Sequence, residues 1–189
     1  MGKKVFYKTR SMLYKIMKLS GLHMKKTTVI YGISLLTDFD IYLFKEGRHT
    51  SLYDKLGAHA ADVDGMKGAH FAVWAPDAVN VSVIGDFNGW DGNSHLLKVR
   101  DDWSGIWEGF IPGVVKGSVY KYLLTSRYGG YTVEKGDPFA FFWEEPPKTA
   151  SVVWNPDYRW SDGEWMRSRR ARNSLNAPIS IYEVHLGSW

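Results

Sequence analysis

The sequence contains no cysteine, and no run of apolar residues in it approaches the roughly 20 residues that a membrane-spanning helix needs. The first absence excludes disulfide scaffolds, thiolate metal sites and thiol nucleophiles, and it fits a reducing cytoplasm best. The 189 residues are 44% hydrophobic and 15% aromatic, which is enough for one or two cores of ordinary size. We therefore expect a soluble, globular, cytoplasmic protein.

Acidic residues are absent from residues 1–26, which carry eight Lys or Arg. The rest of the chain is net acidic, so it lacks the positive surface that a nucleic acid partner requires, and we expect no such partner. Apolar residues interleave with Lys in this segment at a loose helical spacing, which leaves contact with a membrane surface as an alternative. The simpler interpretation is a basic, disordered tail, or a start site assigned too early with Met24 as the true first residue.

Recognisable catalytic and metal-binding patterns are also missing. The six histidines show no HExxH or other ligand spacing, and the glycine-rich stretches fit neither common nucleotide-binding motif. Paired acids such as Asp101 with Asp102 and Glu144 with Glu145 stand in turn-like sequence, where solvated carboxylates are usual. The sequence therefore predicts no cofactor and no metal, and it shows neither the facing carboxylates of a glycosidase nor an activated nucleophile.

The order of patterns predicts a mainly β fold with a short N-terminal helix. Thr37 or Asp38 is a suitable N-cap, apolar residues follow at helical spacing, and Gly47 ends the pattern. The apolar period then changes to two, and turn residues separate six short segments. The predicted strands are 69–75, 79–85, 95–100, 105–112, 118–125 and 150–154. This pattern predicts an immunoglobulin-like antiparallel β-sandwich, with Trp74 and Trp107 in its core.

Four regions are predicted along the chain. Residues 1–26 form the basic tail, residues 27–65 a helical lead-in, and residues 66–155 the sandwich. Residues 156–189 form a C-terminal extension that begins with an extended, Arg-rich connector. Its last stretch, "ISIYEVHLGSW", is predicted to be an apolar strand with nothing after it to pair with, which we interpret as the start of a truncated second domain.

Trp90 stands in the turn sequence "GDFNGWDG", where it lacks the strand neighbours that normally bury an indole. A sugar ring has an apolar face of C–H groups edged by hydroxyls, so its receptor needs a flat aromatic ring and a few polar side chains. Trp90 is suited to supply the ring, and Asn88 offers both a donor and an acceptor. Lys121 faces outward if Tyr120 and Tyr122 face the core, because side chains alternate along a strand.

Tyr131, just past the turn at Gly129-Gly130, is a candidate second ring. The alternative for Trp90 is that it folds back over the end of the sandwich and binds no ligand. Stacking half an indole on a sugar removes ~100 Å² of apolar area, worth roughly 2.5 kcal/mol before association costs. Weak binding to long, repetitive ligands is therefore expected.

Several motifs, taken in order, resemble one family. The stretches "HFAVWAPDAVNVSVIGDFNGWDG", "GIWEGFIPGV", "YKYLL", "KGDPFAF" and "PPKTASVVW" are similar to the family-48 carbohydrate-binding module of bacterial 1,4-alpha-glucan branching enzymes. The upstream "SLLTDFDIYLFKEG" and "LYDKLGAH" resemble the lead-in of the same enzymes. The terminal "ISIYEVHLGSW" resembles the first barrel strand of the alpha-amylase superfamily. The resemblance runs from about Ser34 to Trp189.

The resemblance implies a glycosyltransferase of glycogen biosynthesis. Such an enzyme cuts an α-1,4 glucan through a covalent intermediate and transfers the segment to a 6-hydroxyl, without a cofactor or metal. Its catalytic acids lie on later strands of a (β/α)₈ barrel, so we expect no branching activity from this chain in isolation. Trp90, Lys121 and Tyr131 match glucan contacts of related modules, although Trp is usual at the third position in regulatory-subunit relatives. The implied partners are α-glucan and the catalytic barrel of the same enzyme.

Three alternatives remain open at this point. The chain could be the front module of a debranching or trehalose-forming amylase relative, a glycogen-targeting regulatory module like the β subunit of AMP-activated kinase, or a structural spacer that binds no sugar. The stretches "YEVHLGSW" and "LYDKLGAH" favour a branching enzyme over the first, and the barrel-like terminus argues against the second.

Overall fold

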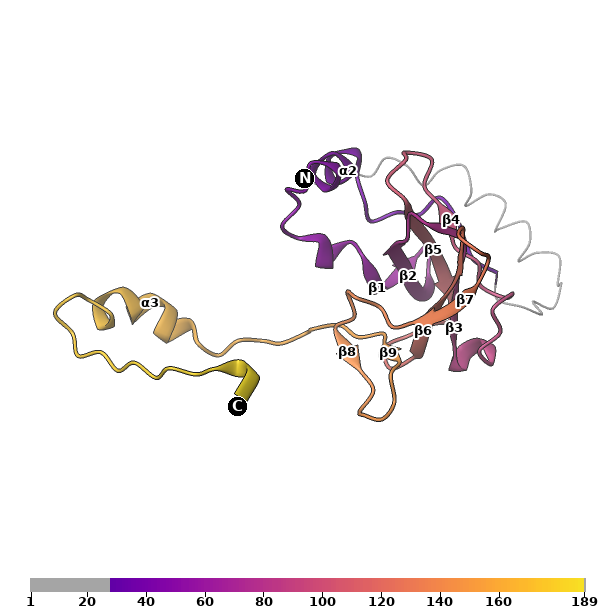
Figure 1. The fold of residues 1–189 in the computed structure, drawn as a ribbon. Helices are drawn as coiled ribbons and strands as arrows, with labels where there is room; N and C mark the ends of the chain where they lie inside the picture. Colours follow the sequence, from indigo (N-terminus) through magenta and orange to yellow (C-terminus); the bar gives the residue numbers. More distant parts are fainter. Residues whose placement is uncertain (1–27, 189) are drawn as a thin grey trace. The chain divides into compact units, whose positions relative to one another are not determined.

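The computed structural model describes residues 28–188, and these divide into two units (Figure 1). The first unit extends to Asn155 and the second begins at Pro156. This division falls where the sequence predicts the end of the sandwich. The expectations for the basic tail lie outside the described residues.

Two antiparallel sheets form the first unit, which confirms the predicted immunoglobulin-like sandwich. Sheet A has the order β1 (Gly57–Val63), β2 (Met66–Trp74), β5 (Ile106–Pro112) and β4 (Lys98–Val99). Sheet B has the order β3 (Ala78–Gly85), β6 (Val119–Ser126), β9 (Ser151–Val152) and β8 (Phe142–Trp143), and β7 (Thr132–Lys135) also pairs with β6. The 3₁₀ turns η1 (Leu52–Asp54) and η2 (Asp86–Asn88) lie in the connections.

The main core lies between the two sheets. Phe71 of β2 meets Tyr120 of β6 edge-on, with ring centroids 5.1 Å apart, and both side chains are fully buried. Val81 and Val83 of β3 face the same core. Alternate residues of the strands supply these contacts, so the period of two in the sequence locates the core correctly.

A second apolar layer covers the other face of sheet A. Helix α2 (Asp38–Lys45) begins at the predicted N-cap Thr37, whose side chain accepts a hydrogen bond from the Asp40 N–H while the Asp40 carboxylate accepts from the Thr37 N–H. This capping box confirms the predicted helix start. Ile41 of the helix packs with Leu36, Leu56, Ala72 and Ile106.

The structure adds three strands that the alternation pattern did not predict: β1, β7 and β8. The sandwich therefore begins at Gly57, inside the predicted lead-in. Trp107 is buried as predicted, but the prediction for Trp74 is wrong, because its ring is 55% exposed. Trp74 ends β2 on the face that α2 covers, and Phe44 packs edge-on against its ring there, with centroids 5.9 Å apart.

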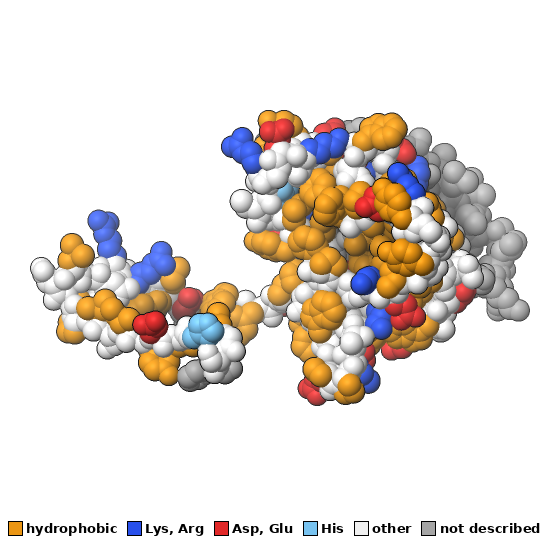
Figure 2. All heavy atoms as spheres, in the orientation of Figure 1, with side chains coloured by type: hydrophobic (Ala, Val, Ile, Leu, Met, Phe, Trp, Pro, Cys, Tyr) orange, Lys and Arg blue, Asp and Glu red, His pale blue; other side chains and the backbone are white. Residues whose placement is uncertain are grey.

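The second unit contains α3 (Gly163–Arg172) and the 3₁₀ turn η3 (Leu186–Ser188). The extended connector predicted here is wrong for residues 163–172, which are helical. Residues 179–185 form no strand, and Ile179, Ile181 and Tyr182 are exposed, so apolar side chains lie on the surface of this unit (Figure 2). The barrel-strand interpretation of this stretch stays a prediction. Among residues 28–188, no helix is long and apolar enough to cross a membrane.

Candidate functional site

The loop that carries Trp90 joins β3 to β4 and has a fixed backbone. Gly89 and Trp90 both have positive φ, at +63° and +62°, and the Asp91 N–H donates to the Asn88 carbonyl at 3.3 Å. Two central residues with positive φ are the signature of a type I′ turn, which tryptophan adopts only under constraint. The Trp90 indole N–H also donates to Asp86 Oδ1 at 3.0 Å. The ring is 40% exposed, so it lies at the surface and does not fold back into the sandwich.

Asn88 lies beneath this loop and is engaged by the protein itself. Its Oδ1 accepts from the Gly85 N–H at 2.9 Å, and its Nδ2 donates to the Val83 carbonyl at 2.9 Å and to His95 Nδ1 at 2.8 Å. The half-buried amide therefore ties the loop to the end of β3. The geometry gives Asn88 a supporting role, in contrast to the sugar contact that the sequence predicts.

Gly85 allows the loop to leave β3 close to β6. A Cβ at this position would lie 2.1 Å from the Val119 carbonyl oxygen and 2.7 Å from the Phe87 ring. Only glycine fits such an approach, which explains the first glycine of "GDFNGW" without reference to a ligand.

Lys121 lies on β6 with the orientation that alternation predicts. Tyr120 and Tyr122 on either side are fully buried, and the Lys121 side chain points the opposite way and is 21% exposed. Its Nζ lies 3.4 Å from Glu134 Oε2 on β7. The prediction that Lys121 faces out is confirmed.

A buried carboxylate fixes β6 from the inner side. Asp137 Oδ2 accepts from the hydroxyls of Tyr120 at 2.6 Å and Tyr122 at 3.0 Å, and Oδ1 accepts from the Phe139 N–H at 2.8 Å. Burial raises the pKa of Asp137, although these hydrogen bonds oppose the rise. Sequence reasoning gave this residue no role, because an isolated Asp in "KGDPFAF" shows no sign of its burial.

Trp90 and Lys121 meet at an open hollow of about 370 Å³, here called the Trp90 hollow. Its lining residues come from the loop after β3, from β6 and from the hairpin between β8 and β9: Asp86, Trp90, Lys121, Glu144, Lys148, Thr149 and Ala150. Glu144 pairs with Lys148 at 3.2 Å, four residues apart. This spacing of opposite charges is the one feature of the sequence that could have pointed to this hairpin as part of the hollow.

Tyr131 does not line the Trp90 hollow. It precedes β7, is 63% exposed, and its carbonyl accepts from the Ser126 N–H. Ser126 lies five positions beyond Lys121 on β6, roughly 16 Å at ~3.3 Å per residue. A single glucose unit cannot bridge that distance, so Tyr131 could contribute only to binding of a longer chain.

The arrangement suits recognition of a neutral polyhydroxy ligand. A half-exposed indole offers an apolar face. Negatively charged carboxylates and positively charged ammonium groups line the rim of the hollow. Among residues 28–188, no group of three or more His, Asp or Glu residues could hold a metal ion.

Comparisons with known proteins find one matching family and several similar enzymes. Residues 55–140 match carbohydrate-binding module 48, described as the isoamylase N-terminal domain. The chain is 56% identical over 156 residues to the 1,4-alpha-glucan branching enzyme GlgB of Aquifex aeolicus, and 56% identical over 153 residues to that of Albidiferax ferrireducens. These alignments cover 82% and 81% of this chain but 24% of each relative. The chain thus spans about a quarter of the length of these relatives.

Solved pullulanase structures are also similar. Ligand-free PulA from Klebsiella pneumoniae matches 53% of this chain and 10% of its own, with 27% sequence identity and a TM-score of 0.44. Another Klebsiella pneumoniae pullulanase structure, complexed with maltotriose, covers the same shares with 27% identity and a TM-score of 0.43.

Proposed function

Because residues 55–140 belong to the carbohydrate-binding module 48 family, we propose that the first unit binds α-glucan at the Trp90 hollow. The observation that carries this proposal is that one hollow contains both Trp90 and Lys121, which lie 31 positions apart on different elements. A glucose ring would stack on the exposed indole, and Lys121 would donate to its hydroxyls. The fixed turn beneath Trp90 supports this role because a ring that is already ordered loses little entropy on binding.

The whole protein to which this chain corresponds is proposed to be a cytoplasmic branching enzyme of glycogen biosynthesis. High identity to branching enzymes over 82% of the chain supports this. In that setting the first unit would hold a growing glucan near a catalytic barrel in the same enzyme. The purified 189-residue chain is expected to leave the iodine stain of amylose unchanged, and a shift in that stain would contradict this expectation.

Affinity electrophoresis in gels that contain glycogen tests the binding proposal. Wild type is expected to be retarded, and Trp90→Ala is expected to lose most of the retardation because the stacking surface is gone. Tyr128→Ala is a matched control, because Tyr128 is also an exposed ring on a turn but does not line the Trp90 hollow. Tyr131→Ala should weaken binding of long glucans only. Equal mobility of all proteins with and without glycogen would favour the spacer alternative.

A further inference from the structure

Trp103 shares with Trp90 a backbone conformation that bulky residues rarely adopt. Among residues 28–188, the non-glycine residues with positive φ are Asp64, Trp90 and Trp103, at +52°, +62° and +61°. Two of these three are tryptophans on loop tips. A bulky side chain at positive φ is disfavoured, so a fold keeps it only where the surroundings impose it, which is most common at functional sites.

The hairpin that carries Trp103, residues 100–106 from the end of β4 to the first residue of β5, is tightly constrained. Asp102 Oδ1 accepts from the Ser104 N–H at 3.0 Å, and Asp102 Oδ2 accepts from Arg100 Nε at 2.6 Å. The Asp102 carbonyl accepts from the ammonium group of Lys45 on α2. The indole at this fixed tip is 95% exposed. The constrained loop therefore leaves nearly the whole ring exposed to solvent.

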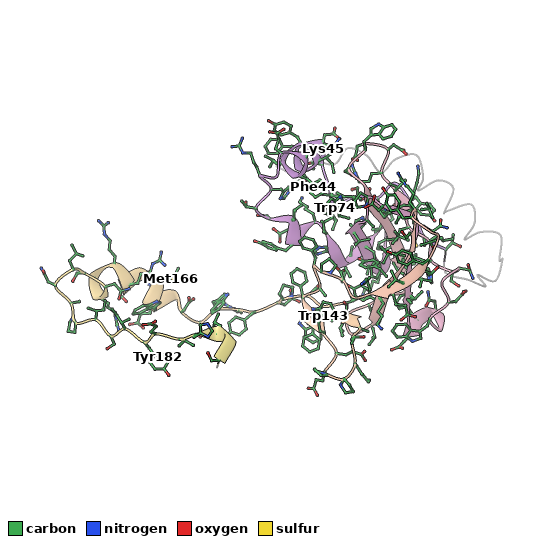
Figure 3. The ribbon with its side chains drawn as sticks, in the orientation of Figure 1. Phe44, Lys45, Trp74, Trp143, Met166 and Tyr182 are labelled. Carbon is green, nitrogen blue, oxygen red and sulfur yellow. The ribbon has the colours of Figure 1, made fainter. Side chains whose placement is uncertain are left out.

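A second indole is tied to the same hairpin. Trp74 Nε1 donates to the Ser104 carbonyl at 3.1 Å, and Phe44 packs edge-on against the Trp74 ring. Figure 3 shows Phe44, Lys45 and Trp74 together on the side of the unit where α2 lies. Trp74 remains 55% exposed. The hairpin thus carries one almost fully exposed indole and accepts a hydrogen bond from a second, half-exposed indole at the end of β2.

A polar hollow adjoins this hairpin, as one adjoins Trp90. Its volume is about 430 Å³, and its lining includes Tyr31, Lys98, Arg100, Asp101 and Asp102. The two aspartates directly precede Trp103 in the chain. Trp103 does not itself line this hollow, whereas Trp90 lines its own. Both loops nevertheless carry an indole at positive φ with an aspartate close to it, and a lysine from a strand lines each hollow.

We propose that the 100–106 hairpin is a second α-glucan contact, separate from the Trp90 hollow, with Trp103 as its stacking ring. The ligand class rests on the proposed function; the location rests on the exposure, backbone and hydrogen bonds of the hairpin. The hollow beside the hairpin is lined by side chains of both charge signs. Such groups can hydrogen-bond the hydroxyls of a neutral sugar, and they suit an apolar protein partner less well. Two separate contacts on one module would let a long or branched glucan bind at both, which raises its apparent affinity through effective concentration.

Indole N–H signals in ¹H–¹⁵N spectra of the full chain test this inference with maltoheptaose as the probe. Trp90→Ala and Trp103→Ala identify the two signals by their loss. In wild type, both signals are expected to shift on titration. The Trp103 signal should still shift in Trp90→Ala, and the Trp90 signal should still shift in Trp103→Ala with less than a twofold change in apparent Kd, because a heptasaccharide occupies each contact separately.

Retardation in glycogen gels tests whether one glycogen molecule binds at both contacts. Trp103→Ala is expected to weaken apparent glycogen affinity about threefold to tenfold, and the double variant to abolish it. The Tyr128→Ala variant should bind as wild type does. Addition of 0.5 M NaCl should leave binding nearly unchanged, because the ligand is uncharged.

Three outcomes contradict the inference in different ways. If the Trp90 signal shifts and the Trp103 signal does not, the second contact is wrong and the proposed function stands. If neither signal shifts, the proposed function fails together with the inference. If the Trp103 signal moves with protein concentration and not with sugar, the hairpin is a contact between copies of the chain, and the glucan assignment is overturned.

Discussion

The two sheets of the first unit are covered on their outer faces by different kinds of structure. Sheet A is covered by α2 and the residues around it, whose side chains Leu36, Ile41 and Leu56 are buried. Over sheet B lies part of the Trp90 loop, where a Cβ on Gly92 would be 2.3 Å from Leu123 of β6. The apolar side chains buried in this layer contribute stability, whereas a tight turn contributes little burial and leaves the Trp90 hollow open. The comparison thus sets a cover that buries apolar side chains against a loop that leaves the proposed binding site open.

Loss of the buried Asp137 carboxylate, which holds β6 of sheet B from its inner side, should reduce the stability of the fold the most. Asp137→Ala leaves two buried tyrosine hydroxyls and the Phe139 N–H without their acceptor, and we expect a loss of about 3 to 5 kcal/mol in the free energy of unfolding. Urea denaturation at pH 7 measures it. Asp137→Asn is the control, because it keeps one acceptor oxygen and should lose less. An Asp137→Ala loss below 1 kcal/mol would mean that this carboxylate does not fix β6.

Loss of a buried side chain from α2, the helix that covers sheet A, should have the second-largest effect on stability. Ile41→Ala removes a buried side chain from the layer between α2 and sheet A, and we expect it to cost about 2 to 4 kcal/mol. Phe39→Ala on the same helix is a matched control, because Phe39 is 66% exposed and its loss should change stability by less than about 1 kcal/mol. Equal losses for the two variants would show that the helix does not act as part of the core.

Low pH should destabilise the packing of α2 on sheet A, because it protonates the Asp40 carboxylate. Burial alone would raise the pKa of Asp40, but hydrogen bonds from Thr37, His49 and Lys55 outweigh it and hold that pKa well below 3.8. The charged form is thus stabilised by folding, and its contribution is present above pH 3.8 and lost as the pH falls below it. Asp40→Ala should cost about 1 to 2 kcal/mol at pH 7. Its difference from wild type should shrink between pH 4 and pH 2.

The matched control is Asp38→Ala, because Asp38 is an exposed carboxylate in the first turn of the same helix. It should cost about 0.3 to 0.5 kcal/mol at pH 7 through the helix dipole. A gap between wild type and Asp40→Ala that stays constant from pH 7 to pH 2 would contradict the role of the charged carboxylate.

The sequence predicts the elements whose periodicity is strong. Alternation located β2, β3, β5 and β6, and capping residues located the start of α2. It missed β1 because "GAHAADV" is small and polar and takes its strand character from pairing with β2. It missed α3 because Arg dominates that helix and no apolar stripe runs along it, so no helical period exists to detect. The high helix propensity of Ala, Met and Arg was the remaining indication of this helix in the sequence.

The candidate site could be predicted only in part, for a related reason. Trp90 and Lys121 stand out because turn composition and alternation are local properties of the chain. That they line one hollow, and that Glu144 and Lys148 complete it, depends on the pairing of β6 with β9 and of β9 with β8, which local patterns do not encode. The same limit explains Asn88: its residue type suits a sugar contact, but the loop itself uses its hydrogen bonds.

The smallest expected effect concerns the turn over sheet B and compares two replacements of Trp90. At φ +62° alanine is strained and glycine is not, so Trp90→Gly should be more stable than Trp90→Ala by about 1 kcal/mol. Trp107, buried in the regular strand β5, is the control: there glycine should be less stable than alanine. Both Trp90 variants should lose the same share of the glycogen retardation. If alanine proved the more stable replacement at residue 90, the turn would not impose the positive φ, and the indole would not be held ready for a ligand.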